Sequence, residues 1–225
     1  LIDAMGYKFE EICSEELLLL FQMQSDCCGA MSNQMGIRAS YVSGLEGLRT
    51  NPYFEKVTLQ FIANNDPLFY ELTDDARILS NLNLTGTSIT PAGNALMYPI
   101  IELRANASNV TVERFVNDTA EYALGLGNPT LGYTLTAGKY LIIDTDPRNF
   151  RATLYPDNVS ILDQINYPAS NAAGKGMMLP GYNSWRAEWT TPNVGQELIL
   201  RWKNRFLSTD SITFGNGCGF CCRDN

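Results

Sequence analysis

Short segments in which apolar and polar residues alternate, separated by turn-forming residues, fill the chain from Met97 onward. The clearest apolar sets are Phe150, Ala152 and Leu154, then Trp185, Ala187 and Trp189, then Leu198, Leu200 and Trp202. Because successive side chains of a strand point to opposite faces of a sheet, this period of two predicts strands with one buried face. Several such strands joined by turns predict an antiparallel β-sandwich over residues 97–207.

Shorter apolar runs in the same half extend this prediction. Residues 100–104 and 110–115 are expected to be strands on either side of a turn, and residues 140–143 to be a buried strand. The inward positions of two packed sheets are expected to be Leu141, Ile143, Leu198, Leu200 and Trp202.

A second region rich in strands is predicted before residue 75. Val57, Leu59 and Phe61 share one face of a predicted strand, with polar residues on the other face. Pro67 ends this region of pairing, because proline has no backbone N–H to donate to a sheet.

Residues 17–43 fit two interpretations when the residues are taken alone. Ser14 followed by acidic residues is a suitable helix start, and the run of leucines after it could continue a helix. Alternatively, Ile37, Ala39 and Tyr41 alternate with polar residues, which fits a hairpin of two strands around a turn-like Cys-Cys-Gly loop.

The domain plan follows from these patterns. We expect a first β domain at residues 1–75, a linker at 76–96, the sandwich at 97–207 and a cysteine-rich tail at 208–225. Residues 76–96 are rich in Asn, Thr, Ser and Gly and lack a sustained period, which is typical of a linker. The chain begins with Leu1 rather than Met, so we expect that an upstream portion preceded it.

Composition excludes several classes of partner. A net charge of -8 and a pI near 4.6 oppose a phosphate-binding surface, so no specific nucleic acid is expected as a partner. The longest apolar run, residues 17–21, is far shorter than the roughly 20 residues of a membrane-spanning helix, so no membrane is expected either. Acidic residues precede that run where a signal peptide would carry positive charge.

Catalytic motifs are scarce in this sequence, and we expect neither enzymatic activity nor a cofactor. The 225 residues contain no histidine, which excludes serine triads, cysteine–histidine pairs and zinc sites that use histidine. Asp144 and Asp146 could in principle act as the carboxylate pair of a glycosidase, or bind Ca²⁺ together with Asn149. The favoured interpretation is that these residues cap a turn, because Asp side chains bond to local backbone groups.

Cysteines and tryptophans leave two further possibilities open. The six cysteines fall into two groups, and Cys27, Cys28, Cys218 and Cys221 could form a zinc thiolate site, disulfides or free thiols. Trp185 and Trp189 could form a platform that stacks on sugar rings, although their alternation favours a place in the sandwich core. The carbohydrate-binding β-sandwich module is therefore the alternative function.

Several segments, taken in their order along the chain, resemble those of a known protein family. These segments are residues 37–47, the strand at 57–62, Asp66-Pro67-Leu68-Phe69-Tyr70, residues 137–144 and Met178-Leu179-Pro180-Gly181-Tyr182-Asn183. In this order, over residues 36–206, the chain resembles the distal tail protein family of long-tailed bacteriophages, also called the siphovirus minor tail family. The resemblance favours the hairpin for residues 17–43; the cysteine-rich end departs from the family pattern.

The resemblance implies both a fold and a role. The fold would be mainly β, with residues 1–75 as the C-terminal part of a tail-ring domain and a galectin-like sandwich after it. The role would be that of a structural virion protein, a homohexameric ring assembled in the host cytoplasm that joins the tail tube protein to the tail tip or baseplate hub proteins. The second domain would offer a docking surface for fibres or receptor-binding proteins, and the strands at 37–45 and 57–61 would lie at contacts between subunits.

Overall fold

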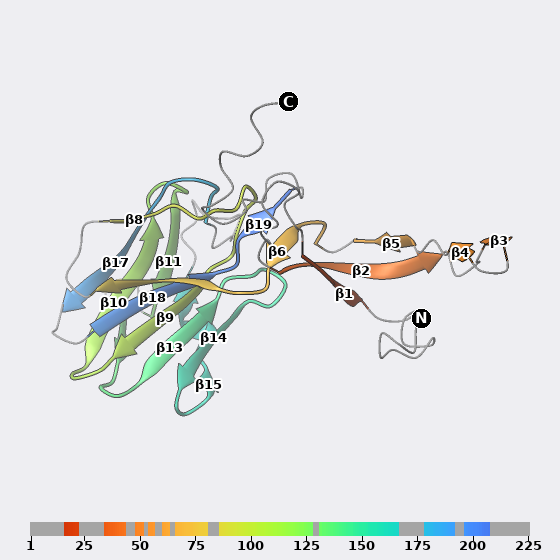
Figure 1. The fold of residues 1–225 in the computed structure, drawn as a ribbon. Coiled ribbons are helices and arrows are strands. Elements are labelled where there is room, and N and C mark those ends of the chain that lie inside the picture. Colours follow the sequence, from red (N-terminus) through yellow and green to blue (C-terminus); the bar gives the residue numbers. More distant parts are fainter. Residues whose placement is uncertain are drawn as a thin grey trace. The chain divides into compact units, whose positions relative to one another are not determined.

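The computed structural model describes residues 16–22, 34–43, 48–51, 54–56, 60–63, 66–80, 86–127, 131–166, 178–191 and 196–207. Strands dominate these residues, which confirms the mainly β fold class (Figure 1). The chain forms two compact units: unit 1 contains residues 1–72 and 206–225, and unit 2 contains residues 73–205.

Unit 2 is a sandwich of two antiparallel sheets. One, called here the β9 sheet, has the order β15 (Val159–Ser160), β14 (Arg151–Tyr155), β13 (Tyr140–Asp144), β9 (Ile100–Ala105), β18 (Gln196–Trp202) and β7 (Asp75–Ser80). The other, the β10 sheet, has the order β16 (Ile165–Asn166), β11 (Tyr122–Leu126), β10 (Val110–Asn117), β17 (Asn183–Thr191) and β8 (Thr87–Ile89), with β12 (Tyr133–Leu135) also paired to β10. A short 3₁₀ turn, η2 (Leu162–Gln164), precedes β16.

The core of unit 2 lies between these sheets. Strand register aligns apolar residues in rows across the β9 sheet, so that Leu141 lies opposite Leu103, and Leu103 lies opposite Leu198. In the β10 sheet, Phe115 lies opposite Leu124 on one side and Ala187 on the other. The buried cluster includes every inward position that the sequence predicted: Leu141, Ile143, Leu198, Leu200 and Trp202.

The predicted linker at residues 76–96 is wrong in one respect, because it contains two strands of the sandwich. β7 pairs with β18 from Asp75 opposite Trp202 to Ser80 opposite Glu197, and β8 pairs with β17. Further along, Ala95 and Met97 are buried in unit 2. β7 and β8 each end the strand order of their sheet, and a composition rich in Asn, Ser and Thr does not prevent a strand there from pairing its backbone groups with the one neighbour it has.

Unit 1 contains a smaller sheet with the order β1 (Leu17–Phe21), β2 (Met35–Ser43), β6 (Phe69–Glu71) and β19 (Arg205–Phe206); β5 (Gln60–Ile62) also pairs with β2. β1 and β2 form an antiparallel pair from Leu17 opposite Ala39 to Phe21 opposite Met35, so the hairpin is present and the helix is not. A separate pair joins β3 (Leu48–Asn51) and β4 (Phe54–Lys56). Val57 and Leu59 lie outside the described residues.

Candidate functional site

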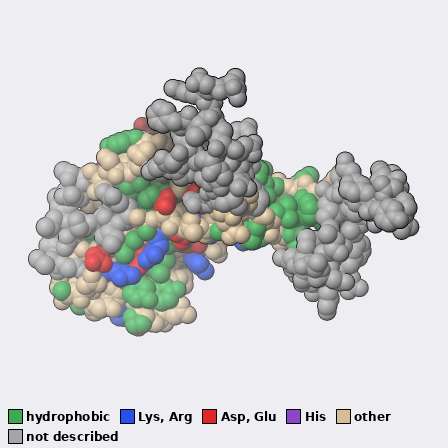
Figure 2. All heavy atoms as spheres, viewed as in Figure 1, with side chains coloured by type: hydrophobic (Ala, Val, Ile, Leu, Met, Phe, Trp, Pro, Cys, Tyr) green, Lys and Arg blue, Asp and Glu red, His purple; other side chains and the backbone are tan. Residues whose placement is uncertain are grey.

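One face of the unit 1 sheet carries exposed apolar side chains. Register places Leu18 opposite Arg38, Leu20 opposite Gly36 and Ile62 opposite Ser40, all on one face. The members of this exposed apolar face are Leu18, Leu20 and Ile62, whose exposed fractions are 36%, 50% and 48%. Figure 2 shows hydrophobic side chains gathered on this part of the molecule.

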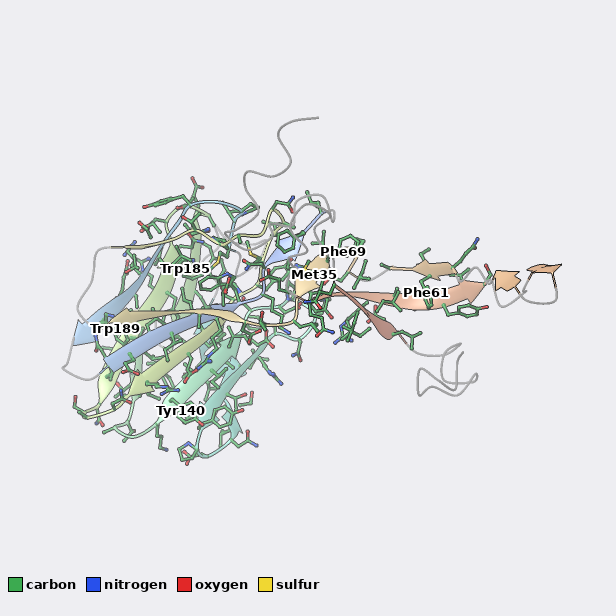
Figure 3. All side chains as sticks on the ribbon, in the orientation of Figure 1. Met35, Phe61, Phe69, Tyr140, Trp185 and Trp189 are labelled. Carbon is green, nitrogen blue, oxygen red and sulfur yellow. The ribbon has the colours of Figure 1, made fainter. Side chains whose placement is uncertain are left out.

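The opposite face of the same sheet holds a small cluster. Met35 and Phe206 are buried there, and Phe69 packs against them (Figure 3). Farther along the strands, Tyr41 and Phe61 meet edge to face with their ring centroids 5.9 Å apart. In the part of unit 1 that the structure describes, this is a small core compared with that of unit 2.

Asp144 and Asp146 lie at the turn after β13, where the turn itself uses their carboxylates. Asp144 Oδ1 accepts from the backbone N–H of Asp146 at 3.2 Å, and its Oδ2 accepts from Asn149 Nδ2 at 3.0 Å. Asp146 accepts from the backbone and guanidinium of Arg148 at 2.6–3.0 Å. These contacts are those of the turn-capping interpretation.

Electrostatics at this turn oppose the role of a general acid. The hydrogen bond from the Arg148 side chain lowers the pKa of Asp146, whereas the acid of a glycosidase needs a raised pKa. Among the described residues, no group of three or more Cys, Asp or Glu side chains has the geometry of a metal site. The local contacts therefore give Asp144, Asp146 and Asn149 a structural role.

The two tryptophans considered for sugar stacking belong to the sandwich interior. Trp185 is 1% exposed, and its ring meets Tyr122 edge to face at 6.3 Å. Trp189 is partly buried and packs against the same core (Figure 3). A buried ring cannot stack on a surface sugar, so Trp185 is not part of a sugar platform.

The side chain of Asn183 holds the Leu-Pro-Gly-Tyr-Asn segment, residues 179–183, in a closed loop. Its Oδ1 accepts from the backbone N–H of Leu179 and from Asn117 Nδ2, both at 2.9 Å. Its Nδ2 donates to the carbonyl oxygens of Leu179 at 2.8 Å and Gly181 at 3.0 Å. Gly181 has φ = 82°, the left-handed region that favours glycine, so the segment closes a tight loop onto the start of β17.

The outer face of the β10 sheet carries a row of ion pairs. Arg114 bonds to Glu188, which also accepts from Arg186, and Arg186 pairs with Asp118 at 3.0 Å. Burial raises the pKa of Glu188, but the hydrogen bonds from Arg114 and Arg186 outweigh it and leave this pKa below its usual range. The hydrogen bond to Asp118 likewise raises the pKa of Arg186.

The thiol hypotheses fall outside what the structure describes. Cys27, Cys28, Cys218 and Cys221 all lie beyond the described residues, so the zinc site and the disulfides stay predictions. No described helix has the length and apolar character needed to cross a membrane.

Comparisons with protein-family models, with curated proteins and with solved structures found no match to this chain.

Proposed function

We propose that this protein is a structural subunit of a ring at the distal end of a phage tail, and that unit 1 forms the ring. The observation that carries the proposal is the exposed apolar face of the unit 1 sheet. The order of sequence segments that resembles the distal tail protein family supports the same role.

The physical argument concerns how a sheet buries its apolar surface. A stable domain packs at least two layers around one core, and unit 2 does so by itself. The described part of unit 1 has only a small cluster on one face and leaves Leu18, Leu20 and Ile62 exposed on the other. Full burial of such a side chain from full exposure gains about 1.5–3 kcal/mol, and these side chains, already half buried or more, would gain roughly half of that each, which favours a covering layer. In our proposal a second copy supplies that layer.

Strand edges add to the tendency to associate. Among the described strands, β1 ends the strand order of the unit 1 sheet, so it has a neighbour on one side only. An uncovered edge invites pairing with another chain, and an ordered ring uses that tendency in a controlled way. The β2 and β5 strands, with Ile37, Tyr41 and Phe61, would then lie beside contacts between subunits.

The proposed partners follow from this arrangement. Unit 1 would contact its own copies in a ring, which the resemblance implies is hexameric, together with the tail tube protein and the tail tip or baseplate hub proteins. Unit 2 would offer its surface to fibres or receptor-binding proteins in the virion. An acidic ring lumen would suit DNA passage, because like charges keep the nucleic acid from adhering.

Light scattering after size exclusion, with negative-stain microscopy, tests the proposal on the full chain. We expect the wild-type protein to form rings and the double variant Leu20→Arg/Ile62→Arg to be monomeric. The matched control is Val159→Arg/Leu162→Arg in unit 2, whose wild-type side chains are 51% and 45% exposed, against 50% and 48% for the test pair. A wild-type protein that stays monomeric at all concentrations would refute the ring assignment.

A further inference from the structure

The last residues of unit 2 are held by a loop of the same unit that the ring function does not use. This loop, residues 92–96, is called here the collar; it lies between β8 and β9 and contacts Asn204 and Arg205. Arg205 is the last residue of unit 2, and Phe206 is the residue at which the chain returns to unit 1. Both belong to β19, which follows β6 in the strand order of the unit 1 sheet (Figure 1). The collar therefore holds one residue of a strand whose other residue belongs to unit 1.

Asn204 joins the collar to both ends of unit 2. Asn204 is buried, and its Oδ1 accepts from the backbone N–H groups of Ala92 at 3.1 Å and Gly93 at 3.3 Å. The same oxygen accepts from Trp202 Nε1 at 3.3 Å, and the Nδ2 of Asn204 donates to Asp75 Oδ2 at 2.6 Å. Asp75 is the first residue of β7 and Trp202 the last of β18, so one side-chain amide binds the loop, the entry and the exit of unit 2.

Arg205 is held by the rest of the collar through its backbone and its side chain. Its carbonyl oxygen accepts from the N–H groups of Asn94 at 2.9 Å and Ala95 at 3.1 Å. Its Nη1 donates to the carbonyl oxygen of Leu96 at 2.9 Å, and its guanidinium lies over the Tyr98 ring, 5.3 Å from the centroid. Arg205 is only 8% exposed, and a cation–π contact is stronger when the cation is shielded from water. These contacts fix the first residue of β19 in place.

The collar lies closest to this segment at Gly93. A Cβ atom placed on Gly93 would lie 2.6 Å from the backbone oxygen of Arg205 and 2.7 Å from its backbone nitrogen. Both distances are shorter than an ordinary van der Waals contact, so the close approach of the two backbones requires glycine here. A side chain at position 93 would push the collar and Arg205 apart.

A shift of Arg205 would reach the core of unit 1 through the chain itself. Phe206 follows Arg205 directly and is buried with Met35 in the small unit 1 cluster, against which Phe69 of β6 packs. Because consecutive residues are joined by a rigid peptide unit, Arg205 cannot be displaced without moving Phe206. The small size of the cluster makes its strands sensitive to the loss of one buried ring.

We propose that the collar couples the two units, because β19 can pair with β6 only while residues 92–96 are closed on Asn204 and Arg205. Gly93 and Asn204 are then positioning residues, which act on Phe206 through Arg205. An event on unit 2 that opens the collar would release β19 from the unit 1 sheet. This coupling does not rest on the ring function, since it concerns two units of one chain.

Hydrogen exchange of the full-length protein, measured by mass spectrometry of its peptides, tests the coupling where tryptophan fluorescence shows unit 2 to be folded. The test variant is Gly93→Ala. The matched control is Gly125→Ala in the β10 sheet, where the added Cβ would lie 3.2 Å from the backbone oxygen of Asn166. We expect the amides of β6 and β19 to exchange about fivefold or more faster in Gly93→Ala than in the wild type, and at the wild-type rate in the control.

Three results of this experiment would overturn the proposal. The first is unchanged exchange of β6 and β19 in folded Gly93→Ala, and the second is an equal rise in Gly125→Ala. The third is a rise that β9 and β13 share equally, because it would reflect a loss of unit 2 stability alone.

The reverse perturbation gives a second measurement, because a coupling free energy acts equally in both directions. Phe206→Ala weakens the hold of unit 1 on β19 and changes no residue of the collar. We expect the amides of Asn94 and Ala95, which donate to Arg205, to exchange several-fold faster in this variant. The control is Tyr41→Ala, which weakens unit 1 where Tyr41 meets Phe61, between β2 and β5. Unchanged exchange of these collar amides in folded Phe206→Ala, or an equal rise in Tyr41→Ala, would contradict the coupling.

Discussion

Replacement of Asn183 by alanine should destabilise unit 2 strongly, because one buried side chain closes a loop and joins two strands. The change removes the acceptor of Asn117 Nδ2, and Asn117 is fully buried. A buried donor that loses its acceptor costs about 1–3 kcal/mol. The bonds to Leu179 and Gly181 lie in a partly exposed loop, so their loss costs less, about 0.5–1.5 kcal/mol each.

Together these terms predict a loss of roughly 3 kcal/mol or more in the free energy of unfolding of unit 2, and a fall in Tm of about 6–12 °C. Tryptophan fluorescence measures this unit selectively in the full chain, because all 3 tryptophans, Trp185, Trp189 and Trp202, lie in unit 2. Asn183→Asp is the informative companion: it keeps the acceptor but places a carboxylate against two carbonyl oxygens. Its stability should therefore rise as the pH falls and the carboxyl group gains a proton. A Tm of Asn183→Ala within about 2 °C of wild type would refute the reasoning.

Three further predictions concern the core, the ion pairs and the turn. Leu200→Ala should cost about 2–5 kcal/mol in a denaturant melt, because Leu200 is fully buried, and an unchanged midpoint would contradict the strand register. The pKa values of Glu188 and Asp146 are lowered in the folded protein, so the stability that these carboxylates contribute should be fully present above their ordinary pKa values of 4.5 and 3.8. This contribution should be lost as the pH falls through the lower pKa values of the folded state, and Glu188→Gln should reduce the loss. Asp144→Asn should leave cell-wall turnover by the full-length protein unchanged, and a measured decrease would restore the hydrolase hypothesis.

Local patterns in the sequence were sufficient for the sandwich core, whereas residues 17–43 taken alone fitted both a helix and a hairpin. Leu198, Leu200 and Trp202 alternate with polar or outward residues. When one face of a strand is buried, this alternation fixes which residues face the core, because a shift of one residue would expose all three. The strands β7 and β8 were missed for the complementary reason. Their neighbours are rich in Asn, Ser and Thr, so pairing with β18 and β17 depends on contacts with residues about a hundred positions away.

The candidate sites depended even more on distant pairing. Asn117 and Asn183 are 66 positions apart, and Gly93 and Asn204 are 111 positions apart. Neither pair has a spacing that could mark it in a single sequence, because only the packing of distant segments brings its members together. The tryptophans illustrate the opposite case: their alternation favoured the core, and Trp185 is buried there.

The position of unit 2 within the chain has a physical basis in its own strand order. The first and last residues of its sheet pairing, Asp75 and Trp202, lie directly opposite each other on neighbouring strands. The chain therefore enters and leaves unit 2 at one place, which is the condition for inserting a domain into another without breaking either core. Unit 1 then takes strands from both sides of the insertion, because β6 precedes unit 2 and β19 follows it in the same sheet. Pairing of β19 consequently depends on unit 2 having brought its own ends together, whereas β1, β2, β5 and β6 all precede unit 2 and can pair with one another without it.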